Sequence, residues 1–89
     1  MNADDRKWLE KERARFIAER DESRADFEKD RAELVSLMAA VESVPLEEFY
    51  DLHERIRIVS DRMHWLEMHA EDREESIQNI DREFANDRD

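Results

Sequence analysis

The segment "FYDLHERIRIVSDRMHWLEMHA", residues 49–70, predicts the fold because its apolar residues recur at alternating steps of three and four. The same spacing continues to Phe84, and its one polar member is Arg73. An unbroken heptad pattern of this kind is typical of a helix that packs against another helix along one seam. The predicted seam comprises Phe49, Leu52, Ile56, Val59, Met63, Leu66, Ala70, Arg73, Ile77, Ile80 and Phe84.

One break interrupts the helical pattern upstream, in the segment "ESVPLEE" at residues 42–48. Pro45 has no backbone N–H and would clash inside a helix, although it fits the first position of a new one. The sequence predicts one helix over about residues 4–42, a turn at 43–45, and a second helix over about 45–86 that ends in a frayed acidic C-terminus. Because the connection is short and the helices have similar lengths, we expect an antiparallel hairpin, with one bent helix as the alternative.

The first of these helices has a less regular pattern. Near the turn its apolar residues keep a heptad register. Farther back, that register meets polar residues, namely Arg13, Arg20, Ser23 and Asp30. An eleven-residue spacing fits this half better, because Phe16, Phe27 and Met38 then form one series.

The expected hairpin closes at the turn, so facing residues have numbers that sum to about 90. This register places Arg73 opposite Phe16, where its guanidinium can stack on the ring or reach Glu19. We expect the half near the turn to be the better packed. The predicted core between the two helices comprises Phe16, Phe27, Leu34, Leu37, Val41, Phe49, Leu52, Ile56, Val59, Met63, Leu66, Ile77, Ile80 and Phe84.

A further set of large apolar residues lies off both seams. It comprises Trp8, Ile17, Val35, Met38, Ile58, Trp65 and Met68. Exposed apolar stripes on a small protein often mark interfaces. We expect a second hairpin to cover them in a homodimeric four-helix bundle, with a foreign partner or simple exposure as the alternatives.

The composition indicates one small all-α domain: 89 residues, 46% charged, with no Gly, one Pro and no Cys. The net charge is −11, and the last third of the chain is the most acidic. Binding of nucleic-acid phosphates or of an anionic membrane surface depends on Lys and Arg, so neither is expected. No apolar run is long enough for a membrane span or a signal peptide, and we expect a cytoplasmic location.

Few residues indicate chemistry. Asp61 and His64 share a helical face, yet a di-iron bundle needs such a pair from two helices, and the first helix has no His. His53 and His69 flank the seam and can make assembly pH-sensitive. Two long helices offer no catalytic cleft, and a chain without Gly has no phosphate-binding loop. The sequence therefore predicts no catalytic residue, no metal site and no cofactor.

These observations favour a non-catalytic protein that acts through protein–protein interaction, as a small dimeric adaptor, regulator or inhibitor. The expected partners are a second copy of the chain and a protein with a basic surface. One alternative is an acidic mimic of nucleic acid that inhibits a DNA- or RNA-binding protein, since a rod of carboxylates can occupy a basic groove.

Another alternative is an accessory subunit of a larger enzyme. The segment "FEKDRAELVSLMAAVESVPLEEFYDLHER", residues 27–55, resembles part of the small subunit of exonuclease VII. The resemblance implies a helical hairpin whose second helix starts at a "PLEE"-like motif. It covers about a third of the chain, lacks the Gly usual in the family's turn, and leaves a much longer first helix. We assign the chain to no family on this basis.

Overall fold

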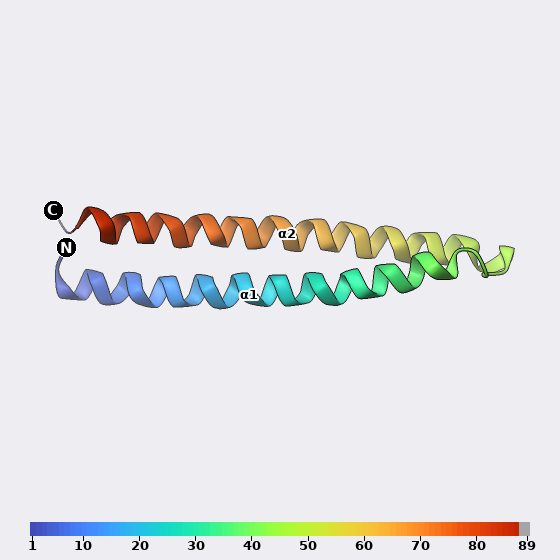
Figure 1. Ribbon diagram of the computed structural model, residues 1–89, viewed down its shortest axis with the longest axis horizontal. Helices are drawn as coiled ribbons and strands as arrows, with labels where there is room; N and C mark the ends of the chain where they lie inside the picture. Colours follow the sequence, from blue (N-terminus) through green and yellow to red (C-terminus); the bar gives the residue numbers. More distant parts are fainter. Residues whose placement is uncertain (88–89) are drawn as a thin grey trace.

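The chain folds into two long helices that run antiparallel (Figure 1). The computed structural model describes residues 1–87, with α1 at Ala3–Ala40, a short 3-10 helix η1 at Leu46–Glu48, and α2 at Phe49–Asn86. The molecule measures 66 × 16 × 15 Å, and Met1 lies beside Asp87 at the end opposite the turn. The predicted all-α antiparallel hairpin is confirmed, and the bent single helix is wrong.

The helix ends follow local capping chemistry. The side chain of Asn2 accepts a hydrogen bond from the backbone N–H of Asp5 at 2.8 Å, which satisfies one of the free donors at the start of α1. Helix α1 stops at Ala40, slightly before the predicted boundary, and the next residues form a turn. The predicted fraying of the C-terminus falls partly on residues 88–89, which lie outside the described residues.

Pro45 separates the two helices by adopting an extended backbone, with φ −62° and ψ 152°. The chain re-enters helical geometry through η1, where the N–H of Glu48 donates to the carbonyl of Pro45 at 3.0 Å. Helix α2 therefore begins at Phe49 rather than directly at Pro45. The extended backbone of Pro45 interrupts the helical geometry, and the 3-10 helix η1 restores it before α2 begins.

The interface between α1 and α2 carries the core. Among residues 1–87, five apolar residues, all on α2, are buried: Val59, Leu66, Ala70, Ile77 and Ile80. The other ten predicted core residues are partly buried, namely Phe16, Phe27, Leu34, Leu37, Val41, Phe49, Leu52, Ile56, Met63 and Phe84. Two helices leave most seam residues with solvent on one side, so the core is long and thin.

The burial pattern of α1 follows heptads along its length. Every seam position from Leu9 to Val41 is buried or partly buried, including the polar ones. Met38, the third member of the proposed eleven-residue series, is exposed. The eleven-residue interpretation is therefore wrong, because polar residues occupy seam positions that the apolar pattern alone does not reveal.

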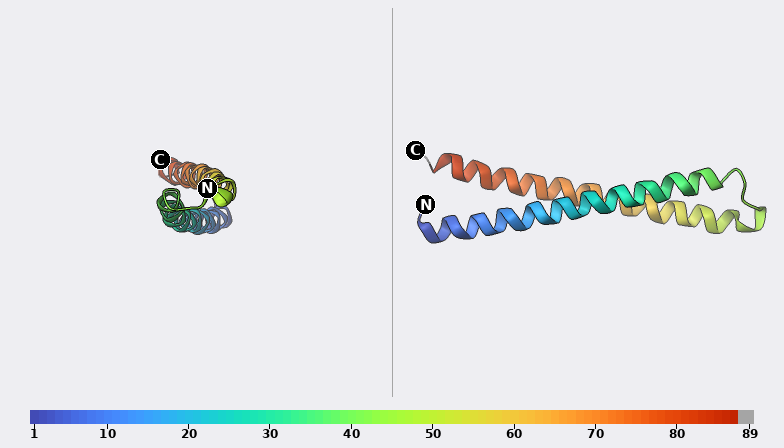
Figure 2. Two further views of the ribbon diagram at one scale, coloured as in Figure 1. Left: turned by 90° about the vertical axis from the view of Figure 1, so that its right-hand side faces the viewer. Right: turned by 60° about the horizontal axis from the view of Figure 1, so that its bottom comes forward.

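The two helices stay in contact from the open end to the turn. The guanidinium of Arg6 lies 5.0 Å from the ring centroid of Phe84 near the open end, and Arg55 bonds Glu33 nearer the turn. Figure 2 shows the helices crossing each other along their length, as packed helices of this spacing do.

Candidate functional site

Polar residues occupy the middle of the interface between α1 and α2. The polar seam, as we name it, comprises Arg13, Arg20, Ser23 and Asp30 of α1 together with their α2 partners Asp81, Glu74, His69 and Arg62. Ser23 and Asp30 are the buried members. Within residues 1–87, every buried side-chain nitrogen and oxygen has a hydrogen-bond partner, so the seam is fully satisfied.

The strongest contact of the polar seam joins Asp30 and Arg62. The guanidinium of Arg62 donates through Nε and Nη2 to the two carboxylate oxygens of Asp30, each at 2.7 Å. These hydrogen bonds hold the pKa of the Asp30 carboxyl below its usual value. The same Arg62 lies 3.4 Å from Glu33, which in turn bonds Arg55. A bidentate pair of this kind fixes how far α1 can slide along α2.

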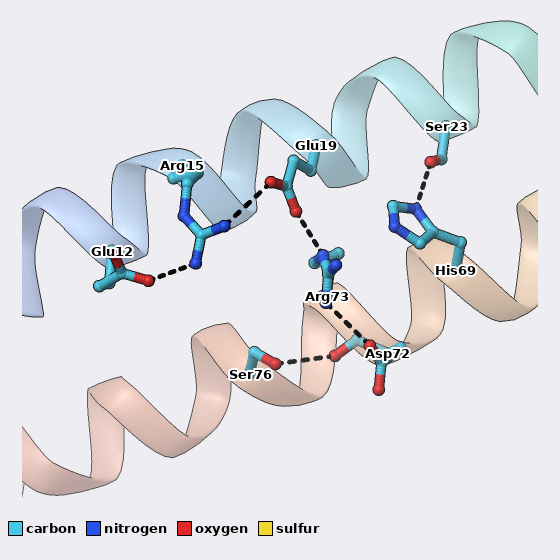
Figure 3. Close-up of polar contacts among 8 residues, drawn as sticks. All are labelled: Glu12, Arg15, Glu19, Ser23, His69, Asp72, Arg73 and Ser76. Atoms are coloured by element: carbon cyan, nitrogen blue, oxygen red, sulfur yellow. Dashed lines mark hydrogen bonds and ion pairs between the residues drawn. The ribbon is translucent and has the colours of Figure 1, made fainter.

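Two turns farther along, Ser23 and His69 form the second polar layer (Figure 3). The hydroxyl of Ser23, whose residue is 5% exposed, lies 2.7 Å from Nδ1 of His69. The ring of His69 stacks on the indole of Trp65, with centroids 5.1 Å apart and planes within 10°. A buried hydroxyl thereby orients an imidazole, which supports an aromatic ring at the surface.

The third layer centres on Arg73, the one polar member of the α2 seam. Its Nε donates to Glu19, and its guanidinium lies 5.5 Å from the ring centroid of Phe16. Both alternatives predicted for Arg73 are therefore confirmed at once. Figure 3 shows that Arg15 links Glu19 to Glu12, so charges alternate along this side of α1.

Two ion pairs close the half of the seam near the open end. Arg20 bonds Glu74 at 2.7 Å, and Nε of Arg13 bonds Asp81 at 2.7 Å. The hydrogen bonds from these arginines lower the pKa of the Glu74 and Asp81 carboxyls. The arginines replace apolar residues of the α1 seam, whereas α2 keeps the buried residues Ile77 and Ile80 at this end. In the described part of the chain, the buried apolar residues lie between Val59 and Ile80 and none lies closer to the turn, so the expectation that the half near the turn is the better packed is wrong.

Acid is expected to destabilise the hairpin through these carboxyls. Asp30, Glu74 and Asp81 have lowered pKa values in the fold, so their stabilisation is complete above the unfolded pKa and disappears as pH falls through the folded pKa. The urea midpoint should be level from about pH 7 to 5.5 and fall below about pH 4, where free carboxyls titrate. Far-UV circular dichroism in urea measures it.

A variant with Asp30→Asn, Glu74→Gln and Asp81→Asn is the control for this pH profile. It should be less stable than the wild type at pH 7 and should show a flatter profile in acid. A wild-type midpoint that rises steadily toward pH 3 would mean that relief of acidic repulsion outweighs the three ion pairs.

Large apolar side chains are exposed beside the polar seam. On α2 they are Ile58, Trp65 and Met68, with Trp65 61% exposed and Ile58 41% exposed. Trp65 borders a recess that Asp26 and Lys29 of α1 also line. Ile58 and Met68 lie seven and three residues from Trp65, which makes them its neighbours on the surface of α2. We name these three residues the Trp65 patch, and Trp65 lies on the same side as the Asp30 and Ser23 layers.

The other predicted interface residues lie elsewhere. Val35 and Met38 are exposed, and Val35 borders a different recess with Arg31. Arg31 and Lys29 are two residues apart, which is about 200° around a helix of 3.6 residues per turn. Val35 and Trp65 therefore lie on opposite sides of the hairpin, and one flat partner surface does not reach both.

Ile17 and Trp8 complete the set. Ile17 is partly buried beside the seam, whereas Trp8 is exposed at the open end, where it borders a recess with Leu9 and Glu83. Sequence spacing placed all seven residues in one off-seam group because it does not distinguish the two flanks of a seam. In the structure, Trp65 and Val35 border different recesses, on opposite sides of the hairpin.

Charges around the Trp65 patch are balanced although the chain is acidic. The recess beside Trp65 is lined by Asp26 and Asp30 and by Lys29 and Arg62. The next pair toward the turn joins Arg55 to Glu33. Opposite charges thus neutralise this part of the surface, which makes it suited to contact with another acidic chain.

The structure pairs a serine with a histidine, which sequence spacing alone did not reveal because 46 residues separate them. A Ser–His pair can activate a nucleophile, yet Ser23 is buried in the interface and Trp65 covers one face of the His69 ring. Among residues 1–87, no three His, Asp or Glu side chains are grouped as metal ligands. His64 is exposed, and Asp61 lies 3.5 Å from Arg57.

Comparison of the chain with protein-family models, curated proteins and solved structures found no significant match. The resemblance of residues 27–55 to the exonuclease VII small subunit therefore rests on the quoted residues alone. No helix among residues 1–87 has the length and apolar character needed to cross a membrane.

Proposed function

We propose that this protein acts by binding other proteins, including a second copy of itself, and not by catalysis. The observation that supports this proposal is the Trp65 patch. Tryptophan is enriched among residues that dominate binding energy, and here its ring is held in place by stacking on His69. An aromatic side chain that is already ordered loses little conformational entropy on binding.

The thin core gives a second reason for association. Five buried apolar residues on one helix are few for a chain of 89 residues, and covering the Trp65 patch would add burial that a single hairpin lacks. A standard interface buries about 800 Å² on each partner, which is roughly one eighth of the accessible surface of 6852 Å². A face of this 66 Å rod is large enough for such a contact.

The partner on the Trp65 patch is a second hairpin in this proposal. In a two-fold dimer the same patch meets itself, so both copies bring Ile58 and Trp65 to the contact. The balanced charges beside Trp65 allow this despite a net charge of −11 on each chain. The product is a four-helix bundle with the polar seams inside each hairpin.

Sedimentation velocity over a range of concentrations tests the dimer. The variant with Ile58→Glu and Trp65→Glu should show a dissociation constant at least about tenfold higher than the wild type, because burial of one large apolar side chain is worth about 1.5–3 kcal/mol. Circular dichroism should show unchanged helix content, since both side chains are exposed.

Val35→Glu with Met38→Glu is the matched control, because it adds the same charge to exposed apolar positions on the opposite side. It should dimerise like the wild type. Equal loss of dimer in both variants would assign the effect to net charge, and a wild-type chain that is monomeric at every concentration would refute self-association.

A further inference from the structure

A groove, which we name the acidic groove, lies on the side of the hairpin away from the Trp65 patch. It has a volume of about 400 Å³, and its floor is formed by Phe27, Leu66 and Ala70. Ala70 is the smallest residue of the α2 seam, where the adjacent members are Leu66 and Arg73. The missing side-chain volume opens the interface at this layer, and Glu67 on the groove rim is about 200° around α2 from Trp65.

The rim of this groove is acidic and partly unpaired. Glu67, Glu71 and Glu75 line it at intervals of four residues, which places them in one row along α2. Within residues 1–87, ion pairs join Glu74 to Arg20 and Arg24, whereas none is formed by these three carboxylates. The row therefore has its charge available for a partner.

We propose that this groove binds an amphipathic basic helix of another protein. The apolar stripe of that helix would lie on Phe27, Leu66 and Ala70, and its Lys or Arg residues, spaced by four, would face Glu67, Glu71 and Glu75. Helix-in-groove binding combines an apolar stripe with matched rim charges in this way. The inference rests on the proposed function, since it names one class of protein that the chain binds.

Charge selects this occupant over others. A second copy of the chain brings a net charge of −11 to an acidic rim and is disfavoured there. An extended basic segment without an apolar stripe would leave the groove floor uncovered. Self-association on the Trp65 patch leaves the groove open, so both contacts can form on one molecule.

Fluorescence anisotropy with three labelled synthetic peptides tests the proposal on the full chain. The first peptide is an amphipathic helix of Leu, Ala and Lys, the second carries Glu in place of Lys, and the third is a scrambled version of the first. We expect binding of the first peptide alone. Equal binding of the scrambled peptide would show attraction by charge without use of the groove and would overturn the proposal.

Two variants locate the site. Glu67→Gln, Glu71→Gln and Glu75→Gln together should weaken binding of the basic helix about tenfold, since each replacement removes one exposed ion pair with the peptide. Ala70→Leu should fill the groove floor and abolish binding while helix content is kept. The control is Glu42→Gln, Glu47→Gln and Glu48→Gln, which removes the same charge at the turn and should bind as the wild type does.

The outcomes separate this inference from the proposed function. If the turn variant weakens peptide binding as much as the groove variant does, the groove proposal is wrong. It is also wrong if Ala70→Leu leaves peptide binding unchanged. Loss of self-association in the groove variant would assign the groove to a second copy and also overturn it. A chain that dimerises through the Trp65 patch yet binds no basic helix would refute the inference while the proposed function stands.

Discussion

Replacement of Ile77 by Ala should lower the free energy of unfolding by about 2–5 kcal/mol. Ile77 is 3% exposed and lies in the α2 seam, in the half of the hairpin where α1 contributes arginines. The register places Arg13 of α1 opposite Ile77, and Arg13 bonds Asp81, so the side chain that faces the vacated space is a paired arginine. Small domains have total stabilities of about 5–15 kcal/mol, so a loss of this size removes a large fraction.

Urea unfolding followed by far-UV circular dichroism measures this change, with Val35→Ala as the control. Val35 is exposed, and surface substitutions of this kind shift stability by about 0.5 kcal/mol or less. The two variants should therefore have clearly different midpoints. Equal midpoints would show that the seam near the open end contributes little packing and that the ion pairs alone hold it.

Replacement of Asp30 and Arg62 together by Leu should raise the free energy of unfolding by about 1–4 kcal/mol. Asp30 is a buried seam residue of α1, and burial of a charge costs solvation free energy that its ion pair offsets only in part. Arg62 is replaced as well, because removal of one partner alone would leave the other charge without its ion pair. Leucine would extend the apolar core across this layer.

Asp30→Asn is the paired variant, because it keeps the size of the side chain and removes its charge. Asn has an NH2 donor in place of one of the two acceptor oxygens, so it cannot form the bidentate pair with Arg62, and this variant should be less stable than the wild type. A drop in stability for the variant with Asp30→Leu and Arg62→Leu as well would show that the bidentate ion pair is worth more than apolar packing at this layer.

The polar seam has a consequence for the proposed function. Asp30 with Arg62, and Ser23 with His69, each match at one register of α1 against α2. A single polar residue in a coiled-coil seam can set register and the number of helices at a cost in stability. These layers therefore direct the Trp65 patch and the acidic groove to opposite sides of one defined hairpin.

Sequence and structure agree where apolar periodicity is strong. The heptad pattern of residues 49–84 predicts the position and the buried side of α2, and Pro45 predicts the reversal, because a residue without an N–H cannot continue a helix. The antiparallel pairing follows from the short connection. Equal helix lengths and one turn leave few other ways to bury two seams.

The contacts of the polar residues are harder to predict from the sequence. Arg73 was placed correctly because its neighbours Phe16 and Glu19 follow from the register of the apolar residues. The contacts of Asp30 and Ser23 were missed. Their side chains look like interruptions of the α1 pattern, and the residues that satisfy them lie on the other helix.

The amino-acid sequence by itself determined two helices, their boundaries to within a few residues, and the seam of α2, because these depend on local capping and on the period of apolar side chains. Only the tertiary structure decided that α1 keeps its heptad register through polar residues. It also decided that Trp65 and Val35 face opposite ways. The physical reason is that a buried charge is tolerated where a partner satisfies it, and the partner's position exists only once the helices have paired.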